Sequence, residues 1–155
     1  MGLNSLADKS SIMQVNITYN GEKIKFNLNE ELKIVESRMQ NDLTNQPRVY
    51  AFLSTLHKKL IIQFEQLEAQ KNKQYGKLFN NYKLSKTTKH YETFKKPPSD
   101  DVCSNLVNTN SIFTELVERT LQAKHDMLIL GSIVRSFEQR ADLLQTISAN
   151  IRKER

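Results

Sequence analysis

The feature that most constrains the fold is a repeating line of mostly apolar residues between Val49 and Tyr82. Steps of 4, 3, 4, 4, 3, 4, 4, 3 and 4 residues connect its members, which are Val49, Leu53, Leu56, Leu60, Phe64, Leu67, Lys71, Tyr75, Leu78 and Tyr82. This spacing repeats every eleven residues and places the side chains on one face of a nearly straight or slightly right-handed helix. The pattern therefore predicts a long helix that packs against a partner.

A second long helical region is predicted after an interruption. The periodicity fails between about 83 and 98, where two consecutive prolines forbid helix, so a loop is expected there. Ser99, followed by two aspartates, is typical of a helix start, and no proline follows before Arg155. Residues 108–110 and Gly131 are weak points at which this helix could kink.

The stretch before the first long helix combines a hairpin signal with two helix starts. Residues 13–28 alternate apolar and polar on both sides of Asn20-Gly21, which predicts a two-residue turn. That turn pairs Val15 with Phe26 and Ile17 with Ile24, and it puts all four on one face, which needs a helix or another copy to cover it. Downstream, Asn29 is a candidate cap for a short helix, and TNQP at 44–47 marks the expected start of the long one.

Composition favours an elongated or shared core. The 155 residues have a mean hydropathy of -0.57, and 26% are charged, which leaves limited apolar material for one globular core. We therefore expect a mainly α protein with long antiparallel helices joined by a basic loop, a small N-terminal β-hairpin and an oligomeric state. The expected organisation is a flexible N-terminus at 1–12, the hairpin at 13–28 and a helical domain at 29–155.

Several functional classes are disfavoured by the residues present. His57, His90 and His125 have no metal-ligand spacing, and Cys103 has no neighbouring histidine, so it reads as a small buried residue. Nucleophile and phosphate-loop motifs are also missing, so we expect no enzyme, metal or cofactor. Without an apolar run of about 20 residues, the chain is expected to be soluble and cytoplasmic.

Positive charge is concentrated between Lys71 and Lys96. This segment holds eight lysines and one acidic residue, with five aromatic residues between them, whereas the whole chain carries +6. Ammonium groups bind phosphates, and unpaired bases stack on aromatic rings, so single-stranded nucleic acid fits better than a duplex. The candidate contacts are Lys71, Lys73, Tyr75, Lys77, Tyr82, Lys83, Lys86 and Lys89. Alternatively, the lysines are a solvated loop or meet an anionic protein or membrane surface, and Tyr75 and Tyr82 are core residues, as Phe79 is expected to be.

Residues 67–82, LEAQKNKQYGKLFNNY, resemble the UvsY family of recombination mediators from tailed phages. Glu68-Ala69-Gln70-Lys71 and Tyr82 match the family motif, and Arg140 with the aliphatic residues after it is similar to the family's ending. The resemblance covers roughly residues 29–155, and the hairpin at 13–28 has no counterpart in the family. Two positions that are basic in the family are occupied here by Gly76 and Leu78. It implies a helical oligomer that binds single-stranded DNA, helps displace the single-strand-binding protein and loads a RecA-like recombinase without catalysis.

A different class of function fits the same long apolar stripes. A phage structural or assembly protein, such as a virion or scaffold component, would use the helices and the hairpin for self-association, and it would then be located in the virion. An adaptor for an acidic partner protein is a further alternative. Only the concentrated lysines and aromatic residues favour the DNA-binding function over these alternatives.

Overall fold

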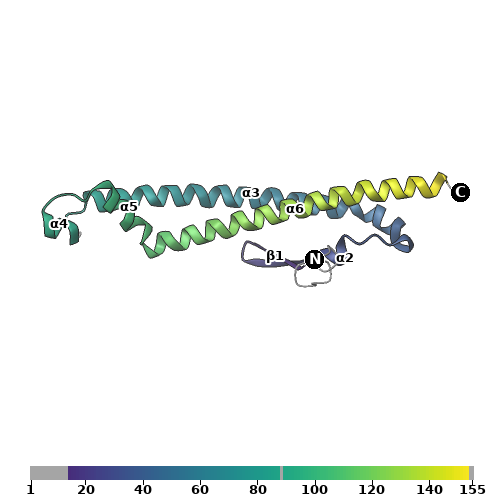
Figure 1. The fold of residues 1–155 in the computed structure, drawn as a ribbon, viewed down its shortest axis with the longest axis horizontal. Coiled ribbons are helices and arrows are strands. Elements are labelled where there is room, and N and C mark those ends of the chain that lie inside the picture. Colours follow the sequence, from purple (N-terminus) through teal and green to yellow (C-terminus); the bar gives the residue numbers. More distant parts are fainter. Residues whose placement is uncertain (1–13, 88, 154–155) are drawn as a thin grey trace, which may run out of the picture. The chain divides into compact units, whose positions relative to one another are not determined.

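The computed structural model describes residues 14–87 and 89–153, most of which are helical (Figure 1). Along the chain the elements are β1 (Gln14–Tyr19), β2 (Glu22–Asn27), α2 (Leu28–Glu31), the 3-10 turn η1 (Glu36–Arg38), α3 (Met39–Leu84), α4 (Lys89–Phe94), α5 (Asp100–Asn108) and α6 (Ser111–Lys153). The predicted mainly α fold with an N-terminal hairpin is confirmed. The expected flexible segment at 1–12 lies outside the described residues.

The chain forms two compact units. The first contains the described residues up to Leu60 together with those from His125 onward, and the second contains Ile61–Lys124. Helices α3 and α6 each contribute residues to both units.

The hairpin has the predicted turn and register. Asn20 and Gly21 both have positive φ, at 50° and 81°, which a two-residue hairpin turn of this kind requires. Strands β1 and β2 are antiparallel, with Val15 opposite Phe26 and Ile17 opposite Ile24. Because the two-residue turn fixes this register, these four apolar side chains lie on the same face of the hairpin.

The apolar face of the hairpin covers helices of its own chain. Ile17 is fully buried in a cluster with α3 and α6 residues, namely Leu53, Leu56, Leu60, Leu130, Ile133, Val134 and Phe137. Burying a large aliphatic side chain of this kind stabilises the fold by about 1.5–3 kcal/mol. In this unit α3 and α6 are antiparallel, because Asp42 of α3 contacts Arg140 of α6 and the later His57 lies beside the earlier Gly131.

Helix α3 begins earlier than the sequence predicted. Its first residue is Met39, and Pro47 lies inside the helix, so the start expected at 44–47 is wrong. The short helix expected here is present as α2, Leu28–Glu31, with Glu30 and Glu31 in its first turn, but its N-cap is Asn27 and not the expected Asn29. At the start of α3, the local sequence signal was overridden by contacts from a distant part of the chain.

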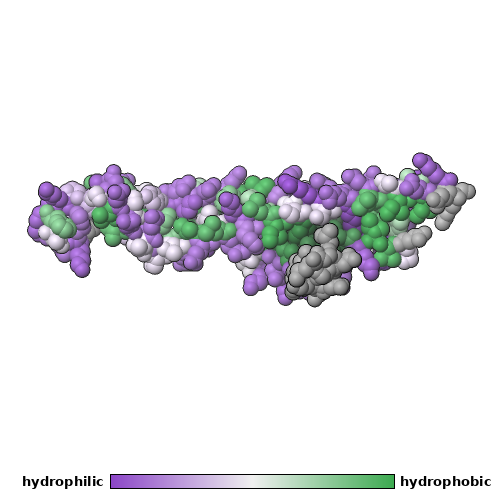
Figure 2. Space-filling view, viewed as in Figure 1, coloured by the Kyte–Doolittle hydropathy of each residue, from purple (hydrophilic) through white to green (hydrophobic). Residues whose placement is uncertain are grey.

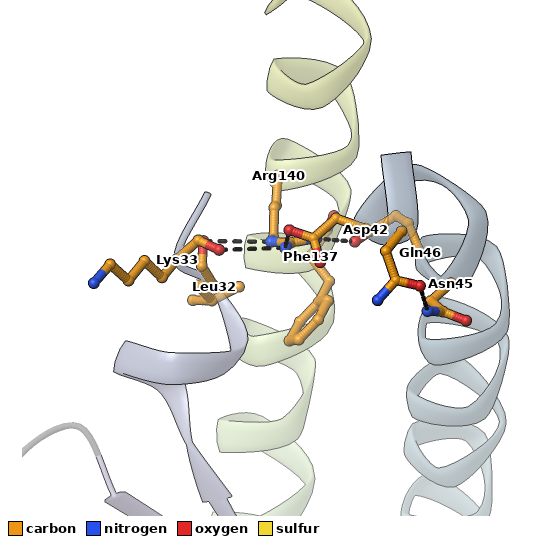
Figure 3. A network of polar contacts seen from close by, with 8 residues as sticks. Leu32, Lys33, Asp42, Asn45, Gln46, Phe137 and Arg140 are labelled. Carbon is orange, nitrogen blue, oxygen red and sulfur yellow. Dashed lines mark hydrogen bonds and ion pairs between the residues drawn. The ribbon is translucent and has the colours of Figure 1, made fainter. Parts of the chain in front are cut away.

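Those contacts are made by Arg140 of α6 (Figure 3). The Arg140 residue is 8% exposed. Its guanidinium donates to the carboxylate of Asp42 at 2.9 Å and to the side-chain oxygen of Gln46. It also donates to the backbone carbonyls of Leu32 and Lys33, both at 3.3 Å. Asp42 and Gln46 are one turn apart in a helix. The network therefore favours a helical conformation in the turn before Pro47. It also connects the segment that follows α2 with helix α6.

The second unit contains a helix break that the sequence located. Ser99 caps α5 by accepting from the backbone N–H of Val102, as predicted. The long helix expected after Ser99 is broken at Thr109 and Asn110, within the predicted weak point. The Asn110 side-chain oxygen accepts from two backbone N–H groups at the start of α6, so it caps that helix. At Gly131, by contrast, α6 continues as helix.

The predicted loop at 83–98 contains a short helix. Helix α3 extends to Leu84, and α4 follows at Lys89–Phe94, so the expectation of a loop throughout is wrong. Within α4, His90 and Phe94 are four residues apart, and their ring centroids are separated by 4.8 Å. A six-residue helix is too short to give a periodic signal, and this local ring contact supports it instead.

Candidate nucleic-acid interface

Two of the eight lysines between Lys71 and Lys96 are held by neighbouring residues. Lys83 of α3 donates to the Asp100 carboxylate at 2.7 Å and to the backbone carbonyl of Pro98 at 2.9 Å. The hydrogen bond that Lys83 donates to Asp100 raises the pKa of Lys83, which keeps the ammonium group charged. Lys71 lies 3.9 Å from the carboxylate of Glu68, one turn earlier. These two predicted contacts thus have partners within the fold.

The other six lysines differ from these two. They are all exposed, and none forms an ion pair with any residue that the structure describes: Lys73, Lys77, Lys86, Lys89, Lys95 and Lys96. An ammonium group that forms no ion pair keeps more of its attraction for an external anion than one that is paired. Four of these six, Lys73, Lys77, Lys86 and Lys89, are among the residues predicted from the sequence.

Lys73 and Lys77 line a groove between α3 and α6 in the second unit. The groove has a volume of about 400 Å³, and its lining is Gln70, Lys73, Gln74, Lys77, Ile112, Glu115, Leu116 and Arg119. On each helix the four lining residues follow the spacing i, i+3, i+4, i+7, so one face of α3 meets one face of α6. The groove brings together three cations and two amides, with one acid.

Arg119 is the member of this site that sequence reasoning missed. It lies far along the chain from the lysines, in a stretch that also contains Glu115 and Glu118. The only signal that could have indicated it is the antiparallel pairing of the two helices, which places residues near 115 beside residues near 74. Arginine binds phosphate in a planar, two-pronged geometry, so its presence strengthens an anion site.

Tyr75 is half-buried and packs within the second unit. Its hydroxyl donates to Ser104 at 3.0 Å, and its ring centroid lies 6.1 Å from that of Phe79 and 5.7 Å from that of Phe113. These contacts match the alternative interpretation of Tyr75 as a packing residue. They also place Phe79 in the same aromatic cluster, as expected.

Tyr82 is half-buried and is also fixed within the second unit. The side-chain amide of Asn110 donates to the Tyr82 hydroxyl at 3.1 Å. Because Asn110 also caps α6, Tyr82 links the last turn of α3 to the start of α6. Both tyrosines predicted to stack on bases therefore have structural contacts.

Comparison of the chain with protein-family models, with curated proteins and with solved structures found no match. The similarity to UvsY therefore rests on the quoted residues alone. Within the described chain, no helix is both long and apolar enough to cross a bilayer. In the same residues, no group of three or more His, Cys, Asp or Glu side chains could hold a metal ion.

Proposed function

We propose that this protein binds single-stranded DNA and acts as a recombination mediator. The observation that carries the proposal is the groove of the second unit, where Lys73, Lys77 and Arg119 lie together. None of the three is neutralised by an ion pair with another described residue. A phosphate in this groove would meet three cations from two helices.

The distribution of charge favours a long anion over a small one. Exposed lysines that form no ion pair with any described residue continue beyond the groove at Lys86, Lys89, Lys95 and Lys96. A chain of phosphates can contact several of these groups in succession, and each contact releases counterions. A flexible single strand can follow such an irregular series of cations, whereas a duplex is stiff over these dimensions.

The mediator role comes from the resemblance to the UvsY family. It implies a homo-oligomer that holds single-stranded DNA and passes it from a single-strand-binding protein to a RecA-like recombinase. In this proposal Arg140 has a structural role, because its guanidinium is buried and donates to Leu32, Lys33, Asp42 and Gln46. No catalytic step is part of the proposal.

The test is an anisotropy titration of labelled single-stranded and duplex oligonucleotides of equal length. We expect tighter binding to the single strand, and weaker binding after Lys73, Lys77 and Arg119 are replaced by alanine. A matched control replaces Lys23, Lys25 and Lys58, which are exposed lysines of the first unit, so that the net charge falls equally. Equal losses in the two triple variants would refute a specific interface.

The alternative function, a phage structural or assembly protein, is supported by a different observation. Large apolar side chains are more than half exposed on both long helices, including Phe52, Ile62, Leu121, Leu128 and Leu143. Exposed apolar surface of this kind is typical of contacts between chains. Light scattering would give a mass several times 18.0 kDa under both proposals, so the absence of DNA binding by that oligomer would favour the structural role.

A further inference from the structure

Helix α4 presents an aromatic pair on the surface of the second unit. Phe94 is 62% exposed, and its ring lies 4.8 Å from that of His90 with an angle of 41° between the ring planes. The four-residue spacing puts both rings on the same side of α4. Figure 2 shows a hydrophobic patch in the α4 region that is surrounded by hydrophilic surface.

Positive charge surrounds this pair along the chain. Lys89 opens α4, and Lys95 and Lys96 follow Phe94 directly, with Glu92 as the acidic residue between them. Lys95 has a φ of 52°, a left-handed conformation that side chains other than glycine rarely adopt, and its N–H donates to the Tyr91 carbonyl at 2.7 Å. This turn ends α4 immediately after Phe94. The exposed ring is therefore flanked by ammonium groups on both sides in sequence.

We propose that α4 is the base-stacking element of the DNA interface, with Phe94 as the residue that contacts a base. The inference rests on the proposed binding of single-stranded DNA and reassigns its aromatic contacts. Tyr75 and Tyr82 are held by Ser104 and Asn110, whereas Phe94 has an exposed ring beside His90. In this arrangement the lysines next to α4 hold the phosphates on either side of the stacked base.

The chemistry of the patch selects a single strand over other partners. Stacking needs an unpaired base, and the faces of bases in a duplex are covered by their neighbours. One exposed aromatic pair is much smaller than the apolar centre of a stable protein interface. The excess of lysine over acid favours a partner rich in negative charge, which a single strand provides together with the base.

The absence of tryptophan from the chain permits a direct test. The variant Phe94→Trp places one fluorophore in the proposed site, and Phe52→Trp places one at a similarly exposed position, 57%, in the first unit. Titration with an oligothymidylate should quench the fluorescence of Phe94→Trp and leave that of Phe52→Trp unchanged. An abasic strand of equal length should quench neither. Quenching of both variants, or of neither, would overturn the inference.

The affinity of Phe94→Ala provides an independent measurement. Loss of one stacked base should weaken oligothymidylate binding by between about 5-fold and about 150-fold. Binding of the abasic strand should not change, because the lysines remain. Circular dichroism should show that the variant keeps its helix content.

The outcomes separate this inference from the function on which it rests. If the wild-type protein binds single strands and Phe94→Ala binds them equally well, α4 is not the stacking element, although the proposed function stands. If the wild-type protein binds neither strand, both proposals fail. If Phe94→Trp responds to vesicles of anionic lipid and not to oligothymidylate, α4 is a membrane-surface contact and the inference is wrong.

Discussion

Replacement of Arg140 by alanine should destabilise the first unit more than replacement of any exposed arginine. The arginine side chain is 8% exposed and donates four hydrogen bonds, to Asp42, Gln46 and two backbone carbonyls (Figure 3). Its removal leaves the Asp42 carboxylate, which is 20% exposed, without its cation. The variant therefore loses both the bonds and the compensation for burying a charge.

The expected loss follows from the degree of burial. Removing one partner of a buried ion pair costs about 3–5 kcal/mol, because the other charge stays buried without compensation. Water can still reach part of the Asp42 carboxylate, so we expect the lower end, about 3 kcal/mol. For a chain of this size that corresponds to a decrease in melting temperature of about 6–12 °C.

The assay is urea unfolding followed by circular dichroism, with all variants at one protein concentration because self-association would change apparent stability. The matched control is Arg135→Ala, an exposed position on the same helix, which should change the free energy of unfolding by less than about 0.5 kcal/mol. Asp42→Ala should cost less in the Arg140→Ala background than in the wild-type protein. If Arg140→Ala were as stable as Arg135→Ala, the network would have no role in stability.

Three further changes test individual contacts of the first unit. A Cβ at Gly131 would lie 2.9 Å from Nε2 of His57, so the His57 ring must move in Gly131→Ala, while alanine favours the helix by about 1 kcal/mol. The two effects oppose each other, so the net change should stay within about 1 kcal/mol, and Gly131→Ala should be clearly stabilising in a His57→Ala background. Asp126→Ala removes the buried carboxylate that accepts from the Thr18 N–H at 3.0 Å, so the free energy of unfolding should fall by about 1–3 kcal/mol. Hydrogen exchange of the Thr18 amide should become faster, and unchanged exchange would count against the contact. Gly21→Ala puts a side chain at a φ of 81° and should cost about 1–2 kcal/mol in a thermal melt, whereas a neutral result would contradict the turn.

The hairpin was predictable because every signal it needs is local. Asn20 and Gly21 tolerate positive φ, and the alternation on both sides of them fixes one register. The sequence did not specify what would cover the apolar face. Leucines of α3 and α6 do so, and they come from parts of the chain that are distant in sequence.

The start of α3 was not predictable because a distant residue decides it. Pro47 is most easily accommodated in the first turn of a helix, so the local rule placed the start beside it. In the structure Asp42 and Gln46 bind Arg140, and the helix continues back to Met39 at the expense of one backbone hydrogen bond at the proline. Nothing near Pro47 in sequence indicates this pairing.

The candidate site was predictable in its charge and less so in its geometry. The concentration of lysines could be read directly, and four of the eight candidate residues are lysines that are exposed and have no ion pair within the described chain. Spacing alone could not decide whether Tyr75 faces solvent or core, since a helix repeat fits both. Arg119 joins the site only through the pairing of α3 with α6, which the local sequence does not indicate. The ring pair of α4 depends on a helix that is too short to give a periodic pattern.

The most direct test of the central claim is the salt dependence of single-strand binding. Each phosphate contact with a single strand contributes about -0.7 to the slope of log affinity against log salt. If Lys73, Lys77 and Arg119 each neutralise one phosphate, their joint replacement by alanine should make the slope less steep by about 2 and lower the affinity. The account predicts this change with helix content retained. A folded triple variant with the affinity and slope of the wild-type protein would contradict it.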